Sequence, residues 1–132
     1  MSTRTNIIIK DPDLQLTFYI YRHCDGYPAY VGKDILEIEK MDSATNAIRY
    51  LLTRENARYE ITDERHGDIE HLYIVTVNNG GIRYGTGYGA EIKTATITRE
   101  AFAEITNTDR HKINTRIDEN YPDTPHLDMV NA

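Results

Sequence analysis

The chain has 132 residues, of which 39% are hydrophobic and 27% charged, and its formal net charge at pH 7 is −6. These values are ordinary for one globular domain, and they argue against a disordered chain. The acidic balance argues against broad, non-specific attachment to nucleic acid, which needs a surplus of lysine and arginine to displace phosphate counterions. The apolar runs are too short to cross a bilayer, so we expect no membrane association.

An antiparallel hairpin is predicted near the start of the sequence. Residues 5–11, TNIIIKD, carry the β-branched run of a strand, and the DPD of residues 11–13 favours a turn. In the next run, LQLTFYIYRH, neighbouring residues should point to opposite sides, because strand side chains alternate. One side would carry Leu16, Phe18 and Ile20, and the other Thr17, Tyr19 and Tyr21.

Two helices are expected next, because apolar residues then recur at spacings of three and four. The first is short and uses Ile35, Leu36, Ile38 and Met41. The second is the main helix of the chain, over residues 42–53, and either Asp42 or Ser43 can cap its start. Its apolar stripe consists of Ala44, Ala47, Ile48, Leu51 and Leu52, which is typical of a helix lying on a sheet.

Strands dominate the following segment. Residues 58–63, RYEITD, predict one strand, and residues 71–77, HLYIVTV, predict another that is apolar on both faces and therefore central in the sheet. The pair Asn79-Gly80 indicates a type I′ hairpin turn, because such a turn needs positive φ at both central positions. Residues 82–89 would form the returning strand.

The predicted fold class is α+β, with a mainly antiparallel sheet of about five strands and the main helix packed on one face. Residues 91–98 are a further strand candidate, and Thr98 is expected to cap a short helix over residues 99–105. We expect residues 1–105 to form a single domain and the polar, proline-containing residues 106–132 to form a C-terminal arm of the same domain.

The first dense polar patch is YRHCDGYP, residues 21–28. Asp25-Gly26 favours a turn, and a residue before proline, here Tyr27, is restricted to extended geometry. Arg22 and His23 point to opposite faces if the strand continues that far. The residues alone therefore favour a structural turn over a binding site.

The second patch is HGDIEHLY, residues 66–73. His66, Asp68 and His71 match no standard zinc spacing, and strand geometry separates Asp68 from His71, so we expect no metal site. If the two patches converge, they form one charged cluster, in which Arg22 should contact Asp68, Glu70 or Asp25. The candidate binding residues are Arg22, His23, Asp25, Tyr27, His66, Asp68 and Glu70.

Glycines and tyrosines supply two weaker signals. The run YGTGYG, residues 84–89, lacks the Lys-Ser/Thr and the long helix of a phosphate loop, so close backbone approach is the favoured interpretation. The ten tyrosines of the chain fit either half-buried strand positions or a recognition surface for a protein or a stacked base. The candidates for that surface are Tyr19, Tyr21, Tyr27, Tyr30, Tyr84 and Tyr88.

Three motifs together, MSTRTNIIIKD, FYIYRHCDGYP and HGDIEHLYIVTV, resemble a group of small proteins carried by tailed phages and prophages. The resemblance covers about the first 78 residues in order and does not extend beyond Tyr84. The chain departs from the group's pattern in having no tryptophan. The resemblance implies a phage accessory protein, with no reaction type, and it strengthens both polar patches as a shared site or a shared structural lock.

We therefore expect an accessory protein that acts by binding in the host cytoplasm, which suits the single Cys24. The favoured role is an early inhibitor of host defence that binds a host protein or a signalling nucleotide. We expect no cofactor, and the protein is compatible with a homo-oligomer. A virion-associated or assembly protein is the first alternative, because a polar arm can join subunits. A small enzyme acting on a nucleotide or phosphodiester is the second, with His23 and His66 as acid and base and Arg22 on the phosphate.

Overall fold

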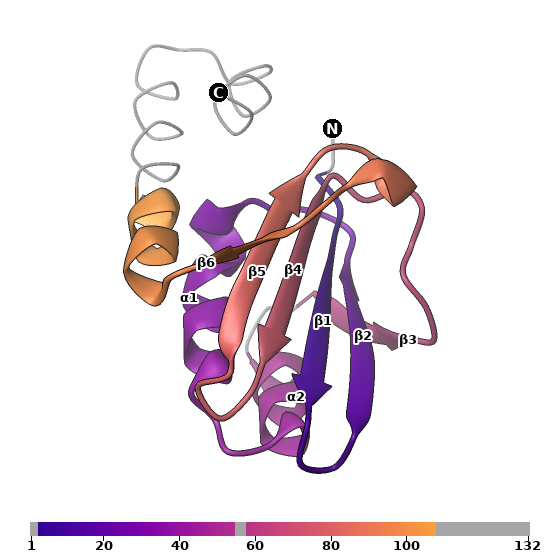
Figure 1. Ribbon diagram of the computed structural model, residues 1–132. Coiled ribbons are helices and arrows are strands. Elements are labelled where there is room, and N and C mark those ends of the chain that lie inside the picture. The colour runs from indigo at the N-terminus through magenta and orange to yellow at the C-terminus, as the bar shows by residue number, and fades with distance from the viewer. Residues whose placement is uncertain (1–2, 55–57, 108–132) are drawn as a thin grey trace.

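The computed structural model describes residues 3–54 and 58–107, which form a six-stranded mixed sheet with helices (Figure 1). The strand order is β3-β2-β1-β4-β5-β6, and β1 pairs with β4 in parallel, whereas every other pair is antiparallel. The strands are β1 (Thr5–Asp11), β2 (Leu16–Arg22), β3 (Tyr59–Thr62), β4 (His71–Thr76), β5 (Gly81–Thr86) and β6 (Ala95–Ile97). The predicted α+β class is confirmed, with one strand more than expected.

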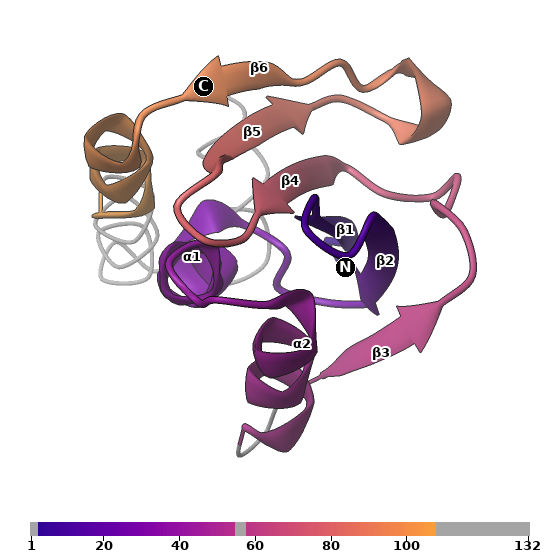
Figure 2. The same ribbon diagram turned by 60° about the horizontal axis from the view of Figure 1, so that its bottom comes forward.

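Two helices cover the same side of the sheet (Figure 2). The main predicted helix is α2 (Ala44–Thr53), whose start is capped by Ser43: the Ser43 Oγ accepts a hydrogen bond from the Asn46 N–H at 3.2 Å. The other helix, α1 (Pro28–Glu39), is longer than the short helix predicted from the apolar spacing. It begins at Pro28 because proline suits the first helical turn and holds the preceding Tyr27 extended.

The C-terminal part of the described chain contains a short 3₁₀ helix, η1 (Gly89–Glu91), and a third helix over residues 99–107. Thr98 caps this third helix as predicted, with its Oγ1 accepting from the Ala101 N–H at 3.1 Å. Of the predicted polar arm, residues 106–107 lie in the helix, and residues 108–132 lie outside the described residues. No helix within residues 3–54 and 58–107 has the length and apolar character needed to span a membrane.

The helix side of the sheet holds the larger apolar core, and the outer side holds a smaller one. The alternation predicted for β2 is confirmed: Phe18 and Ile20 pack in the larger core, and Tyr19 and Tyr21 pack in the smaller one. The larger core is centred on Ile7, Ile9, Ile20, Val31, Ile35, Ile38, Leu51, Tyr73, Val75, Ile82 and Phe102. The smaller core consists of Ile8, Tyr21, Ile69, Leu72 and Ile92.

The turn between β4 and β5 differs from its prediction by one residue. Positive φ occurs at Asn78 and Asn79, at 59° and 60°, so the central pair is Asn78-Asn79 and not Asn79-Gly80. Because Thr76 pairs with Gly81, the connection has four residues, 77–80, and not the two of the predicted hairpin. The backbone N–H groups of these two asparagines donate to the carbonyls of Met41 and Glu39. These contacts with the end of α1 select the earlier of two similar turns.

Candidate functional site: a polar clasp at one end of the sheet

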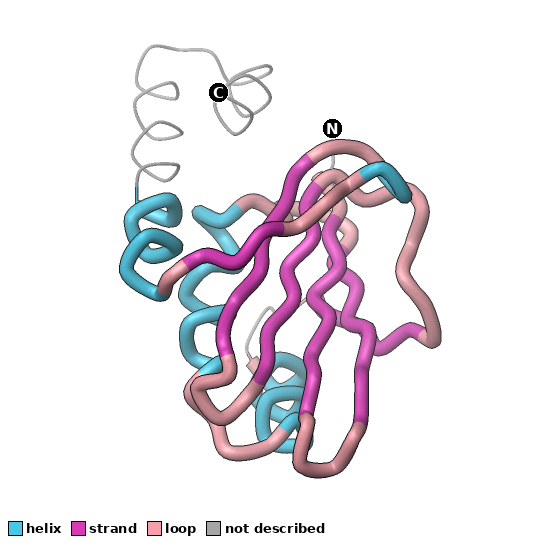
Figure 3. The backbone as a smooth tube through the Cα atoms, in the orientation of Figure 1, coloured by secondary structure: helices cyan, strands magenta, loops and turns pink. Residues whose placement is uncertain are grey.

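The loop between β3 and β4 runs along the side of the sheet to the end at which β1 and β4 begin (Figure 3). There it meets the end of β2 through Tyr21. The Tyr21 hydroxyl donates to Asp68 Oδ2 at 3.1 Å, and the His66 ring stacks on the Tyr21 ring with 3.9 Å between centroids. The predicted convergence of the two polar patches is confirmed.

Arg4 lies at the centre of this convergence. Its Nε is 3.2 Å from Asp68 Oδ2 and 3.4 Å from His23 Nδ1. The Arg4 backbone also takes part, because its carbonyl accepts from the Glu70 N–H at 2.9 Å. We call Arg4, Tyr21, His23, His66 and Asp68 the polar clasp, since they join the first hairpin to the loop before β4.

Arg22 does not make the predicted contact with Asp68, Glu70 or Asp25. Among the ion pairs of the described residues, none involves Arg22. Its Nε donates to the Cys24 carbonyl at 2.8 Å, and its guanidinium lies over the Tyr59 ring at 5.0 Å. The prediction is wrong because β2 continues through Arg22, which places this side chain on the opposite face from Tyr21.

The DGYP part of the first patch builds the entry to α1. Asp25 has a φ of 54°, and the next residue, Gly26, packs so tightly that a Cβ there would lie 2.8 Å from the Thr5 Cβ. The Gly26 carbonyl accepts from the Tyr73 hydroxyl at 2.7 Å. Tyr27 is buried, and this burial raises its pKa to about 12. These four residues therefore act as a strand-to-helix turn.

Asp68 joins other side chains of the clasp. Burial, and then the hydrogen bond to Asp68, raise the pKa of Tyr21 to about 12, so its hydroxyl remains a donor even at alkaline pH. Asp68 Oδ2 is shared by Tyr21 and Arg4, whereas Oδ1 has no hydrogen-bond partner in the described part of the chain. His66 Nδ1 lies 3.8 Å from Oδ1.

The exposed rim of the clasp offers one guanidinium, two imidazoles and one carboxylate. His23 is exposed, and the side chains of Arg4 and His66 are each 34% exposed. Such groups can bind an anion, and an imidazole near a carboxylate can also transfer a proton. No group of three potential metal ligands occurs within residues 3–54 and 58–107.

The glycine run after β5 brings an exposed tyrosine beside the clasp. Gly89 has a φ of 59°, its N–H donates to the Ile69 carbonyl at 2.8 Å, and a Cβ there would collide with the Gly67 carbonyl. A Cβ at Gly85 would likewise collide with the Lys93 carbonyl. Close backbone approach is thus confirmed for this run, and it places Tyr88, which is 66% exposed, next to the loop of His66.

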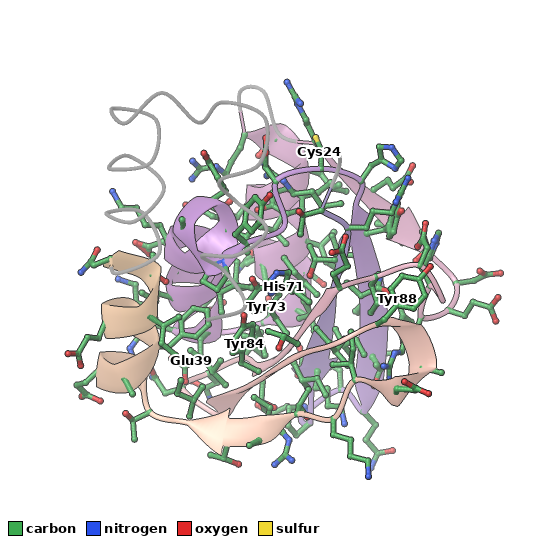
Figure 4. All side chains as sticks on the ribbon, turned by 90° about the horizontal axis from the view of Figure 1, so that it is seen from above. Cys24, Glu39, His71, Tyr73, Tyr84 and Tyr88 are labelled. Atoms are coloured by element: carbon green, nitrogen blue, oxygen red, sulfur yellow. The ribbon has the colours of Figure 1, made fainter. Side chains whose placement is uncertain are left out.

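The six candidate tyrosines do not form one surface. Tyr73 and Tyr84 lie together with His71 in the interior, whereas Tyr88 lies apart at the surface (Figure 4). Tyr21 and Tyr27 are buried, and Tyr30 is exposed. Near the clasp, Tyr88 is therefore the candidate tyrosine that is exposed enough to contact a ligand.

Replacing Tyr21 with phenylalanine should lower the free energy of unfolding by about 1 kcal/mol, because it removes the hydroxyl that donates a hydrogen bond to Asp68. The loss stays small because the Asp68 side chain is 44% exposed and water can replace the hydroxyl. Urea denaturation measures the change. Tyr88→Phe is the matched control and should stay within about 0.5 kcal/mol; equal losses in both variants would show that the Tyr21–Asp68 bond does not stabilise the fold.

Comparison with known proteins finds no significant match: no protein-family model fits the sequence, and neither a curated protein nor a solved structure is significantly similar to it.

Proposed function

We propose that this chain is a phage-encoded accessory protein that acts by binding, and that it inhibits host defence by capturing a host protein or a signalling nucleotide at the rim of the polar clasp. The phage origin is inferred from the resemblance of its three motifs. The observation that supports binding at this place is the convergence of Arg4, His23 and His66 on one exposed rim. Arg4, which lies outside the two polar patches but within the first motif, MSTRTNIIIKD, replaces Arg22 as the proposed anion-binding arginine.

Pre-organisation favours the clasp as a binding surface. Asp68 holds the Arg4 guanidinium, and the buried Tyr21 ring supports the His66 ring, so these side chains lose little freedom when a ligand binds. A phosphate or carboxylate could accept hydrogen bonds from Arg4 and His23. A planar base or an aromatic side chain could stack on the exposed Tyr88.

A thermal-shift screen against mono-, di- and cyclic nucleotides tests the nucleotide form of this proposal. A ligand at 100 times its Kd stabilises the folded state by about 2.7 kcal/mol, which corresponds to a rise in Tm on the order of 10 °C. His23→Ala should remove most of that rise without changing the Tm of the free protein, because His23 is exposed.

Arg49→Ala is the control, since Arg49 is an exposed residue of α2, away from the clasp. It should leave the ligand-induced rise unchanged. A rise that survives His23→Ala and Arg4→Ala would place the ligand elsewhere. If no nucleotide stabilises the protein, the proposal continues only in its host-protein form.

A small phosphodiester-acting enzyme is the second candidate, and the contact between His66 and Asp68 supports it. His66 Nδ1 lies 3.8 Å from Asp68 Oδ1, which is too far for a hydrogen bond, so catalysis would require the carboxylate to move closer, orient the imidazole and leave Nε2 as the acid or base. Measuring turnover in the same screen distinguishes the two candidates. Stabilisation without turnover indicates sequestration, whereas turnover that is lost in both His66→Ala and His23→Ala indicates catalysis.

A further inference from the structure

A groove with a cationic rim lies between α1 and α2, on the helix side of the sheet. Its volume is about 340 Å³, and we call it the helix groove. Its lining residues are Lys33, Leu36, Glu37, Lys40, Tyr50 and Arg54.

The spacing of these residues explains the groove. Lys33, Leu36 and Glu37 share one side of α1, and Lys40 caps its end. Across from them, Tyr50 lies on α2 and Arg54 directly follows that helix. Leu36 and Tyr50 are half-buried and pack against the larger core. The groove therefore combines an apolar floor with a cationic rim.

Arg54 is the most firmly held cation of the rim. Its Nη1 lies 3.0 Å from Oδ1 of Asp34, whose side chain is only 7% exposed, and its guanidinium lies over the Tyr50 ring at 5.1 Å. Asp34 is itself fixed by the Tyr59 hydroxyl, which donates to Oδ2 at 2.6 Å. Within residues 3–54 and 58–107, the Arg54 Nε and Nη2 donate no hydrogen bond, so two donors of an immobilised guanidinium are left for a ligand.

The remaining rim charges favour an anion. Lys33 is exposed and forms no ion pair with the described residues. Lys40 is paired with Glu37 at 3.2 Å, but both side chains are more than 40% exposed, and such surface pairs are weak and exchange readily. The lining therefore carries three cations and one acid, on a chain whose net charge is −6.

We propose that the helix groove binds a small phosphorylated molecule with a planar ring, of mononucleotide size. Arg54 would hold a phosphate through its free donors, and Lys33 and Lys40 would add point charges. Leu36 and Tyr50 would contact the ring. The volume of about 340 Å³ lies within the range of about 300–1,000 Å³ usual for ligand pockets. The helix groove is separate from the polar clasp, and this proposal does not depend on the ligand proposed for the clasp.

Isothermal titration with AMP and with inorganic pyrophosphate, at low salt, tests the proposal. We expect AMP to bind more tightly than pyrophosphate does, and Lys33→Glu and Lys40→Glu each to weaken both ligands at least 10-fold. Arg54 is left intact in this test, because its removal would leave the buried Asp34 without a cation.

Lys93→Glu is the matched control, since Lys93 is exposed and the substitution changes the net charge equally. It should alter both affinities less than twofold. Equal weakening by all three variants, or the absence of binding, would overturn the site. AMP binding no tighter than pyrophosphate would overturn the roles of Leu36 and Tyr50. His23→Ala alters only the clasp. If binding is lost in that variant and kept in Lys33→Glu, the ligand binds at the clasp, and the proposed site in the helix groove is wrong.

Discussion

Replacing Arg99 with alanine should lower the free energy of unfolding by about 3 kcal/mol, because the change leaves a buried carboxylate without its cation. That carboxylate belongs to Glu39, whose side chain is 3% exposed at the end of α1. Glu39 Oε1 forms an ion pair with Arg99, and Oε2 accepts from the Gly81 N–H at 3.0 Å. Arg99 also donates to the Leu36 carbonyl at 3.0 Å, so its removal loosens the third helix, α1 and the start of β5 together.

Urea denaturation at neutral pH measures the effect. The double variant Arg99→Ala/Glu39→Gln should recover about half of the loss, because the neutral amide can still accept from Gly81 and no longer needs a cation. Arg49→Ala, on the exposed surface of α2, should change stability by no more than about 0.5 kcal/mol. A double variant that is no more stable than Arg99→Ala would show that the unpaired carboxylate is not the cause.

Lowering the pH from 6.5 to 4 should destabilise the protein by up to about 3 kcal/mol through His71 alone. His71 is 1% exposed, and burial lowers its pKa to about 4. Its Nδ1 lies 2.8 Å from the Tyr84 hydroxyl. In the unfolded chain the imidazole binds a proton near pH 6.5, whereas in the folded protein it stays neutral until about pH 4. Stability is therefore unaffected above pH 6.5 and falls as the pH drops through this window.

The comparison with His71→Gln isolates this contribution from the carboxylates that titrate in the same range. Glutamine retains a polar partner for Tyr84 and cannot be protonated. The difference in unfolding free energy between the two proteins should therefore narrow steadily as the pH falls from 6.5 to 4. A constant difference across that window would show that His71 takes up a proton as readily in the folded protein as in the unfolded chain.

Most strands, and the residues on each face of β2, could be predicted from the sequence. Side chains of a strand alternate between its two faces, and this alternation is set by local backbone geometry. The parallel direction of the β1–β4 pair was not predicted, although both strands are apolar on both faces, which is the pattern typical of parallel strands. The early start of α1 was missed because its first turns bury small residues, Ala29 and Gly32, which contribute little to an apolar stripe. Pro28 was the available signal, because proline is favoured at the first helical position.

Of the candidate site, the sequence predicted that two loops meet, but not which side chains join them. Arg4 lies outside the two polar patches, in the first of the three motifs and immediately before a strand, where a charged residue has no distinctive spacing. Its role follows from β1 lying between β2 and β4, which places the residue before β1 between the two loops. Tyr21 was assigned to the correct face, yet its burial depends on the loop of Ile69, which local sequence does not specify.

The central position of β1 also affects how the chain folds during synthesis. Thr5 pairs with His71, which is made 66 residues later, so β1 gains its second neighbour late. At about 5–20 residues per second, a ribosome needs roughly 3–13 s to make that segment. In that interval the nascent hairpin exposes a strand edge of three consecutive isoleucines, Ile7, Ile8 and Ile9. Such an edge can pair with another nascent chain, so chaperones that cover apolar strands should act mainly in this interval.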